Sequence, residues 1–292
     1  MKSFKESVRT LDFTVTAKIP LTPATGAALI REQAETLRDS VSAILLTDNQ
    51  FGKVHMSTLA ASAILLQNGV DSIMQLSCRN KNRMALISEL LGAAALGITS
   101  VYLVRGNKLP EGYKPRPKAV NEIGATELIA TAMKMNTDPE IGVPSDFYIG
   151  ASVTPHNPEP NWVPVKLIEN IEAGAQFVQT HACMNMKLMR NYMKHLVAHN
   201  LIRKVSFFGG TAIFPSAEAA RWLRDNRRNV IIPDSIIKRL KQAADPEQEG
   251  VKICTEQLQE MERIPGIAGA NILSGGNVTA ITDAIRAAKL NI

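Results

Sequence analysis

The sequence predicts an α/β fold of the (β/α)8 type, a TIM barrel, in a single domain that spans residues 1–292. Short apolar segments alternate with longer helical patterns along the whole chain, and eight such segments can be counted. Several of them are continuously apolar, as expected of parallel strands that are covered on both faces. No GxGxxG or P-loop motif occurs in the chain, which disfavours a doubly wound open sheet.

Each expected strand is a short apolar run that ends in polar residues or glycine. In chain order the strands are expected at 13–19, 43–49, 72–78, 100–106, 147–153, 177–183, 204–210 and 266–273. Active sites of such barrels lie at the carboxyl ends of the strands, so functional residues are expected there.

Helices with apolar positions at helical spacing separate the strands. They are expected at 24–40, 56–68, 82–96, 124–136, 164–173, 186–199, 216–226, 247–263 and 277–289. An extra helix is expected at 234–243, before the last strand and its helix. Gly69 and Gly97 suit left-handed positions after helices, and Asp234 and Asn277 are predicted N-caps.

Composition and charge exclude several classes of function. The net charge is +6, but no basic stripe with interleaved aromatic residues is present, so nucleic-acid binding is not expected. The densest basic stretch, Arg221–Arg228, ends a predicted helix, where cations favour the helix dipole. An anionic cofactor or substrate explains the excess charge equally well.

The chain is expected to be a cytoplasmic protein that makes no membrane contact. Its N-terminal segment is charged throughout, and no apolar run is long enough to span a bilayer. The cysteines Cys78, Cys183 and Cys254 are far apart, so reduced buried thiols are expected.

The expected strand ends carry amides and basic groups but a single acid, Asp48. A single acid disfavours both the paired-carboxylate chemistry of glycosidases and an oxygen-ligated metal, so no metal site is expected. Inward-facing amides suit a planar heterocycle with alternating donors and acceptors. These residues are Lys18, Thr47, Asp48, Asn49, Gln50, Gln75, Ser77, Arg79, Arg105, Gly106, Asn107, Thr154, His156, Gln179, His181, Gly209, Gly210, Thr211, Ser274, Gly275 and Gly276.

Several of these residues have both a structural and a functional interpretation. Lys18 either reaches the rim and pairs with Asp48 or, if desolvated, acts as a general acid or base. His156, in a proline-rich loop, is either solvated or in contact with a ligand. Gln179 and His181 are alternate residues of one strand, so both face the barrel mouth if either does.

Three loops are candidates for ligand contacts. Arg105 beside Gly106 allows a close approach to an anion, or else simply ends a strand. The stretch 274–276 precedes a helix and resembles a weak anion site. The longest irregular stretch, 107–123, is proline-rich and is interpreted as a functional loop over the barrel mouth.

Taken together, these stretches resemble the methylenetetrahydrofolate reductase family over nearly the whole chain. The segments that carry the resemblance are VTAKIP, LLTDNQFG, QLSCRNKNRMAL, LLGAAALGITSVYLVRGNK, IEAGAQFVQTH, IPDSIIKRLKQAADPEQEGVKICTEQLQEM and IPGIAGANIL. The resemblance implies a flavoprotein of one-carbon metabolism. Such enzymes take hydride from NADH or NADPH onto FAD and pass it to 5,10-methylenetetrahydrofolate, giving 5-methyltetrahydrofolate; a proton must reach the departing N10.

The resemblance also implies roles for individual residues. Those implied to lie at the FAD cofactor are Thr47, Gln75, Ser77, Arg105, Gly106 and His156, with Gln75 standing where many members have histidine. Gln179 and His181 fall in the stretch that binds the pterin of the tetrahydrofolate substrate.

Three positions depart from the family pattern. Lys18, or Ala17 if the gap in the match falls differently, replaces the glutamate that protonates N10. Asn107 replaces an aspartate, and Asn170 replaces a lysine that holds the FAD phosphates. Lys18, His181 and Asn107 are therefore the predicted catalytic residues, and Lys18 also contacts the substrate. Reversing the charge at position 18 places ordinary reductase chemistry in question.

Three interpretations follow. The chain is a reductase or methyl-folate oxidase in which Lys18 or His181 transfers the proton, with FAD bound weakly or hydride delivered directly by the nicotinamide. Alternatively, it is a tetrahydrofolate-binding methyltransferase or a component of a demethylation pathway. The third interpretation is a non-catalytic barrel subunit. A homo-oligomer or a partner protein is expected.

Overall fold

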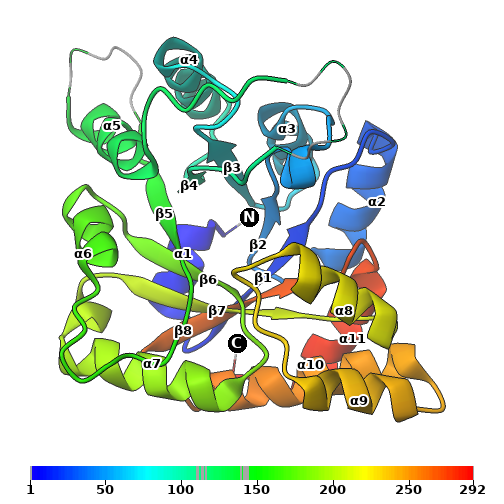
Figure 1. The fold of residues 1–292 in the computed structure, drawn as a ribbon. Helices are drawn as coiled ribbons and strands as arrows, with labels where there is room; N and C mark the ends of the chain where they lie inside the picture. Colours follow the sequence, from blue (N-terminus) through cyan, green and yellow to red (C-terminus); the bar gives the residue numbers. More distant parts are fainter. Residues whose placement is uncertain are drawn as a thin grey trace.

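The computed structural model describes residues 2–109, 112, 115, 117–138, 140 and 145–291. Within these residues, eight parallel strands close into a barrel in the order β1 to β8, surrounded by helices (Figure 1). The prediction of a (β/α)8 barrel is confirmed. The strands are β1 (Thr14–Ile19), β2 (Ala43–Leu46), β3 (Ser72–Ser77), β4 (Ser100–Val104), β5 (Tyr148–Val153), β6 (Phe177–Ala182), β7 (Ser206–Ala212) and β8 (Ile267–Leu273).

Helices follow the strands as the sequence pattern predicts. They are α2 (Ala27–Leu37), α3 (Thr58–Gln67), α4 (Arg83–Ala95), α5 (Ala125–Thr137), α6 (Val165–Glu172), α7 (Met186–Ala198), α8 (Ala217–Asn226), α9 (Asp234–Gln242), α10 (Pro246–Glu262) and α11 (Val278–Ala288), with 3-10 turns η1 (Gln50–Gly52) and η3 (Leu201–Arg203). Helix α9 lies in the range expected for the extra helix.

The helix ends are partly as predicted. Gly69 and Gly97 have φ values of 72° and 77°, the left-handed conformation expected after a helix. The Asn277 side chain accepts a hydrogen bond from the Ala280 amide at 3.1 Å and caps α11. The predicted Asp234 cap is wrong, because Pro233 holds the extended N-cap position of α9 and Asp234 is the first helical residue. The Asp234 carboxylate instead binds Arg224 at 2.8 Å.

Strand β2 is shorter than predicted. We expected it to run over 43–49, but it ends at Leu46. Asn49 and Phe51 have φ values of 44° and 57°, a left-handed backbone that strands do not contain. The chain instead forms the 3-10 turn η1, and its Phe51 lines a cavity together with residues of the barrel strands.

A helix that the sequence pattern did not predict fills the amino-terminal end of the barrel. Helix α1 (Phe4–Thr10) begins with a capping box formed by Ser3 and Glu6. In Figure 1 it lies inside the ring of strands. The Phe4 amide donates to Asp71 Oδ2 at 2.6 Å, and the Phe4 ring enters the barrel.

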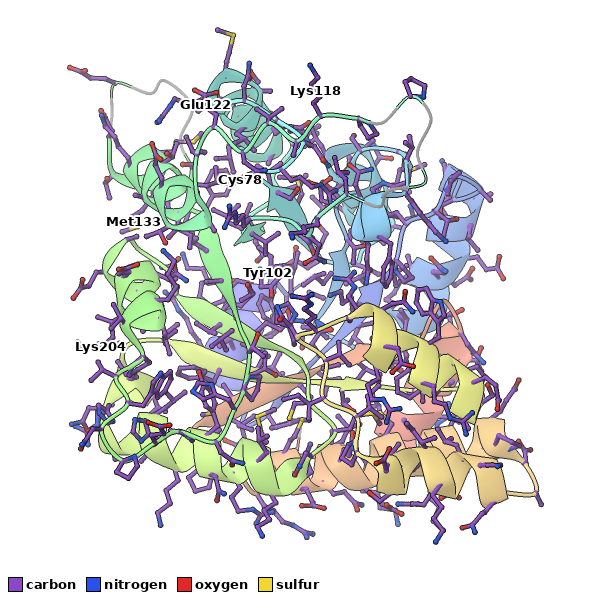
Figure 2. All side chains as sticks on the ribbon, viewed as in Figure 1. Cys78, Tyr102, Lys118, Glu122, Met133 and Lys204 are labelled. Carbon is purple, nitrogen blue, oxygen red and sulfur yellow. The ribbon has the colours of Figure 1, made fainter. Side chains whose placement is uncertain are left out.

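The barrel interior at this end is a cluster of aromatic rings. Phe177 packs within 5.0–6.3 Å, between ring centroids, of Phe4, Tyr102, Tyr148 and Phe208. Figure 2 shows Tyr102 inside the ring of strands. A Cβ at Gly150 would lie 2.1 Å from the Phe177 ring, so glycine is required there. The other described core clusters lie largely between strands and helices.

Two further features concern the described residues alone. None of their helices has the length and apolar character that crossing a bilayer requires. Cys78, Cys183 and Cys254 are buried free thiols, as expected.

Candidate active site

Alternation along the strands directs the predicted site residues into the barrel. On β1, Val15, Ala17 and Ile19 belong to the core cluster under the helices, so Lys18 faces the interior. On β6, Val178 belongs to the same cluster, and Gln179 faces the interior. Gln179, His181 and Lys18 line one cavity, but Gln75 and Arg105, which we expected to converge with them, do not line it.

This cavity, which we call the mouth cavity, has a volume of about 620 Å³. Its walls come from β1, β4, β6, β7, β8, the turn η1 and the end of α8. Among the residues that the structure describes, no aspartate or glutamate lines it. Its cationic residues are Lys18, Lys108, Arg227 and Arg228, its amides are Gln50, Asn107, Gln179, Asn226, Asn229 and Asn271, and its rings are Phe51, Tyr102, His181 and Trp222.

The alternative that Lys18 pairs with Asp48 is wrong. Asp48 Oδ2 accepts a hydrogen bond from the Ser77 amide at 2.8 Å and lies 3.9 Å from Lys81 Nζ. Among the described residues no carboxylate lies within salt-bridge distance of Lys18. Lys18 therefore presents its ammonium group to the mouth cavity rather than to a structural partner.

The basic groups of the mouth cavity perturb one another. Burial, aided by the charge of Arg227, lowers the pKa of Lys18 to about 8. Burial also lowers the pKa of His181 to about 4, with smaller contributions from Lys18 and Arg227. Asn229 Nδ2 lies 3.4 Å from His181 Nε2, which fits a neutral imidazole that accepts there. At neutral pH Lys18 thus carries the proton, and His181 does not.

Two aromatic rings and an arginine close one side of the mouth cavity. The Phe51 and Trp222 rings lie 5.0 Å apart between centroids. The Arg227 guanidinium carbon lies 4.0 Å above the Phe51 ring centroid, a cation–π contact. The helix-dipole interpretation of Arg221–Arg228 does not account for this contact, and no local sequence pattern marks Phe51 or Trp222 as site residues.

Asn271 is a further site residue that the sequence pattern did not single out. It lies in the middle of β8, where its neighbours in register are Thr16 and Gly210. Its exposed fraction is 2%, it lines the mouth cavity, and neither atom of its amide group has a hydrogen-bond partner. Side chains alternate along a strand, and the apolar neighbours Ala270 and Ile272 face the helices, so the sequence could have indicated that Asn271 faces the barrel interior.

A second cavity, of about 1100 Å³, lies at the loops that follow β3 and β4. It shares Asn107 and Lys108 with the mouth cavity, so the two adjoin. Its lining again contains no described acid, and its cations are Arg79, Arg105, Lys108 and Lys118. In Figure 2 the Lys118 side chain points away from the barrel.

Arg79 holds the loops around the second cavity in place. It is 3% exposed, and it donates to the backbone carbonyls of Asn107 at 2.9 Å and Asn49 at 3.0 Å. Gly106, with φ of 87°, packs so closely that a Cβ would lie 2.8 Å from Arg79 Cβ. Of the predicted loop 107–123, Leu109 and Pro117 line this cavity, whereas 110, 111, 113, 114 and 116 lie outside the described residues.

The predicted cofactor residues fall into separate groups. Arg105 and Gly106 line the second cavity. Thr47 and Ser77 are buried at the ends of β2 and β3, and both hydroxyl groups lack a partner. Gln75 is half-buried and lines neither cavity.

His156 and Asn170 lie apart from both cavities. The His156 ring packs edge-on against Trp162, with centroids 4.3 Å apart. Asn170 is buried on α6, where its Oδ1 accepts a hydrogen bond from Thr126 at 2.6 Å. The structure thus ties Asn170 to helix α5, and the cofactor roles of both residues stay predictions.

The stretch 274–276 borders a third, smaller cavity of about 230 Å³. Glu247 and Asp283 contribute to its lining, and the Asn277 side chain already caps the helix that follows. Two carboxylates disfavour an anion, so the resemblance of this stretch to an anion site is not supported.

Comparisons with known proteins agree with the fold. The family model described as methylenetetrahydrofolate reductase matches residues 12–270. Among solved structures, the chain is similar to DmoA from Hyphomicrobium sulfonivorans, with a TM-score of 0.56 and 10% sequence identity over 94% of this chain and 86% of that one. At this identity the likeness concerns the fold alone. No curated protein sequence matches the chain significantly.

Proposed function

The chain belongs to the methylenetetrahydrofolate reductase family, and from this premise we propose that it interconverts 5,10-methylenetetrahydrofolate and 5-methyltetrahydrofolate by hydride transfer. Membership supports a folate-related oxidoreductase in general. The observation that carries the specific proposal is the mouth cavity, in which buried amides adjoin a lysine of lowered pKa.

The amides of the mouth cavity suit the pterin ring. Gln179 is 4% exposed and Asn271 is 2% exposed, and both line the cavity. Each amide offers a donor and an acceptor, which match the alternating donors and acceptors along the edge of a pterin. An unpaired buried amide is costly, so a ligand that pairs with Asn271 is favoured over water-filled space.

Lys18 is the group best suited to protonate N10 as the folate ring opens. A general acid works best when its pKa lies near the working pH, and that of Lys18 is about 8. The pKa of His181 is about 4, so its imidazole is neutral at pH 7 and acts by hydrogen bonding. Lys18 thereby takes the role that the family assigns to glutamate.

Asn107 occupies a position between the two cavities. It lines both of them, so its side chain lies where a substrate and a cofactor would meet. An amide cannot exchange a proton at neutral pH, so we propose that Asn107 orients a ligand by hydrogen bonding rather than acting as an acid or base.

The cationic loops that follow β3 and β4 suit a dinucleotide such as FAD or NAD(P)H. Thr47 and Ser77 each leave a buried hydroxyl without a partner, but neither residue lines either cavity, so they do not carry this part of the proposal. Arg105 and Lys108 in the second cavity would hold the diphosphate. When bound, FAD supplies hydride transfer between a nicotinamide and the one-carbon unit.

The proposal is tested by assaying the purified protein with 5,10-methylenetetrahydrofolate, FAD and either NADH or NADPH. We expect oxidation of the nicotinamide that depends on the folate, and formation of 5-methyltetrahydrofolate. Omitting FAD distinguishes a flavin-dependent reaction from direct delivery by the nicotinamide. The proposal fails if neither folate is converted in either direction with either nicotinamide.

A further inference from the structure

Two histidines lie one helical turn apart at the carboxyl end of α7, outside the ring of strands (Figure 1). His195 belongs to the last turn of the helix, and His199 is its C-cap. The centroids of their rings are 4.3 Å apart, and the ring planes are 30° from parallel. Residues four positions apart share one face of a helix, so the helix holds the two rings side by side. His195 is half-buried and His199 is exposed, so the pair is open to solvent.

One nitrogen of each ring is already engaged by a backbone carbonyl. His195 Nε2 lies 2.8 Å from the Trp162 carbonyl oxygen, and His199 Nδ1 lies 3.0 Å from the His195 carbonyl oxygen. A carbonyl oxygen only accepts hydrogen bonds, so these two nitrogens carry the protons. The other nitrogen of a neutral imidazole then holds a lone pair. His195 Nδ1 and His199 Nε2 are therefore acceptors, and no hydrogen bond from a described residue occupies either of them.

The hydrogen bonds of this histidine pair are those that prepare imidazoles for a metal ion. A metal-bound histidine donates its other N–H to a backbone carbonyl or a carboxylate, which fixes the tautomer and the orientation of the ring. Two histidines four residues apart on one helix face can supply two nitrogens to a single ion. The last turn of a helix also carries the negative end of the helix dipole, which favours a bound cation.

We propose that His195 and His199 form a binding site for a divalent transition-metal ion of the class Zn²⁺, Ni²⁺ or Cu²⁺. Imidazole nitrogen suits these ions, whereas Mg²⁺ and Ca²⁺ prefer oxygen ligands. Within the described part of the chain, no third histidine, cysteine or acid joins the pair in a ligand cluster, so water molecules complete the coordination. The site lies apart from the mouth cavity and does not depend on the proposed function.

A bound ion restrains the segment that follows β5. The His195 ring donates to the Trp162 carbonyl oxygen, and the centroids of the His195 and Trp162 rings are 5.4 Å apart. An ion on His195 Nδ1 fixes this ring and, through the hydrogen bond, the position of Trp162. Since Ni²⁺ and Cu²⁺ quench tryptophan fluorescence at short range, Trp162 also reports whether the site is occupied.

The site is tested by titrating the full-length protein, without a histidine tag, with Ni²⁺. The chain has two tryptophans, so a Trp222→Phe background leaves Trp162 as the only one. We expect saturable quenching of its fluorescence, which Zn²⁺ reverses by displacing Ni²⁺ and Mg²⁺ does not affect. His199→Gln should weaken Ni²⁺ binding at least about tenfold, because loss of a group outside the coordination shell alone costs about 10- to 100-fold.

His55→Gln is the matched control. Both ring nitrogens of His55 are engaged, since Nε2 accepts from the Asn49 amide at 2.7 Å and Nδ1 lies 2.5 Å from the Met56 carbonyl oxygen. This histidine has no free lone pair for a metal, so its replacement should leave the Ni²⁺ affinity unchanged.

Thermal denaturation gives a second readout that needs no tryptophan. Only the folded helix holds the two rings together, so Ni²⁺ binds the folded state in preference to the unfolded one and should raise the melting temperature of the wild-type protein. The melting temperature of His199→Gln should not respond to Ni²⁺. His195→Gln should lose the response as well. Circular dichroism of each variant without metal establishes that a lost response is not a loss of fold.

The metal site is overturned if Ni²⁺ produces no saturable quenching, or if His199→Gln leaves both the quenching and the melting response as they are in the parent protein. It is also overturned if His55→Gln weakens Ni²⁺ binding as much as His199→Gln does, because the ion would then be held by separate histidines rather than by the pair on α7.

Discussion

The two ends of the barrel interior are built from the same alternation of side chains but differ in what fills them. At the amino-terminal end, Phe4 and the aromatic residues of β4 to β7 pack ring against ring. At the carboxyl-terminal end, the inward positions carry Lys18, Gln179 and Asn271, and the space between them is a cavity. One end therefore stabilises the fold, and the other leaves polar groups available to a ligand.

The difference shows why polar residues at the open end deserve a functional interpretation. The interior residues of the aromatic end gain free energy by burial, about 25 cal/mol per Å² of apolar surface. Burial gives Lys18 and Arg227 no such gain in free energy. It disfavours their charged forms and so lowers the pKa of both. Groups that oppose folding in this way are commonly kept for binding or catalysis.

The largest effect, a loss of stability, is expected from disrupting the aromatic cluster at the amino-terminal end of the barrel. Phe177→Ala should lower the free energy of unfolding by about 3–5 kcal/mol, the range for truncating a buried phenylalanine, because Phe177 is 1% exposed. Urea unfolding measures this loss. The folate affinity of the protein that remains folded should stay within about twofold of wild type, since the rings lie outside the lining of the mouth cavity except for Tyr102.

Phe177→Leu is the milder companion, because it retains most of the apolar volume. It should lose less stability than Phe177→Ala and bind folate equally well. A loss of folate affinity without a loss of stability in either variant would contradict the division between the two ends.

The next largest effect is expected from replacing Lys18 at the carboxyl-terminal end of the barrel. Lys18→Met should lower turnover at least about 100-fold, the usual effect of removing a general acid. It should also raise the unfolding free energy at pH 7, because it removes a half-buried charge whose pKa is lowered to about 8. Steady-state kinetics and thermal denaturation measure the two effects, and full turnover in Lys18→Met would make Lys18 structural.

The pH dependence of turnover and that of the unfolding free energy both follow from the titration of Lys18, and together they serve as the control. In the direction that forms 5-methyltetrahydrofolate, the wild-type rate should fall as pH rises above about 8, because Lys18 loses its proton. The gain in stability of Lys18→Met should shrink from about pH 8 toward 10.5, where the wild-type lysine is neutral when folded but still charged when unfolded. Arg227, Lys108, Arg228 and His181 share the cavity, and His181 contributes no titration in this range because its pKa is about 4.

The sequence was sufficient for the architecture and for part of the site. Apolar runs separated by helical patterns predict the closed barrel, and strand parity placed Gln179 and His181 together at its mouth. Helix α1 was missed because it is short, although the Ser3–Glu6 capping box was readable in the sequence. The Asp234 cap failed because Pro233 already occupies the extended position.

The rest of the site depends on folding at long range. Arg227 belongs to the cavity because the left-handed backbone at Phe51 brings a ring beneath it, and no local pattern predicts this contact. In the sequence Asn271 resembles any other polar strand residue. Only the closed barrel, in which β7 and β8 are paired, shows that its side-chain amide is buried without a hydrogen-bond partner. The positions matched to FAD-binding residues, His156 in the loop after β5 and Asn170 on α6, come from family resemblance, which does not specify how these side chains pack.

The most direct test of a folate site at the barrel mouth is a calorimetric titration with 5-methyltetrahydrofolate of the wild-type protein and of Gln179→Leu. Gln179 is 4% exposed and lines the mouth cavity, so its replacement should weaken binding by about tenfold or more, the effect of losing a paired amide. Saturable wild-type binding that weakens in this way is the expected result. Absence of binding, or an affinity that Gln179→Leu leaves unchanged, would contradict the assignment of this cavity to a pterin.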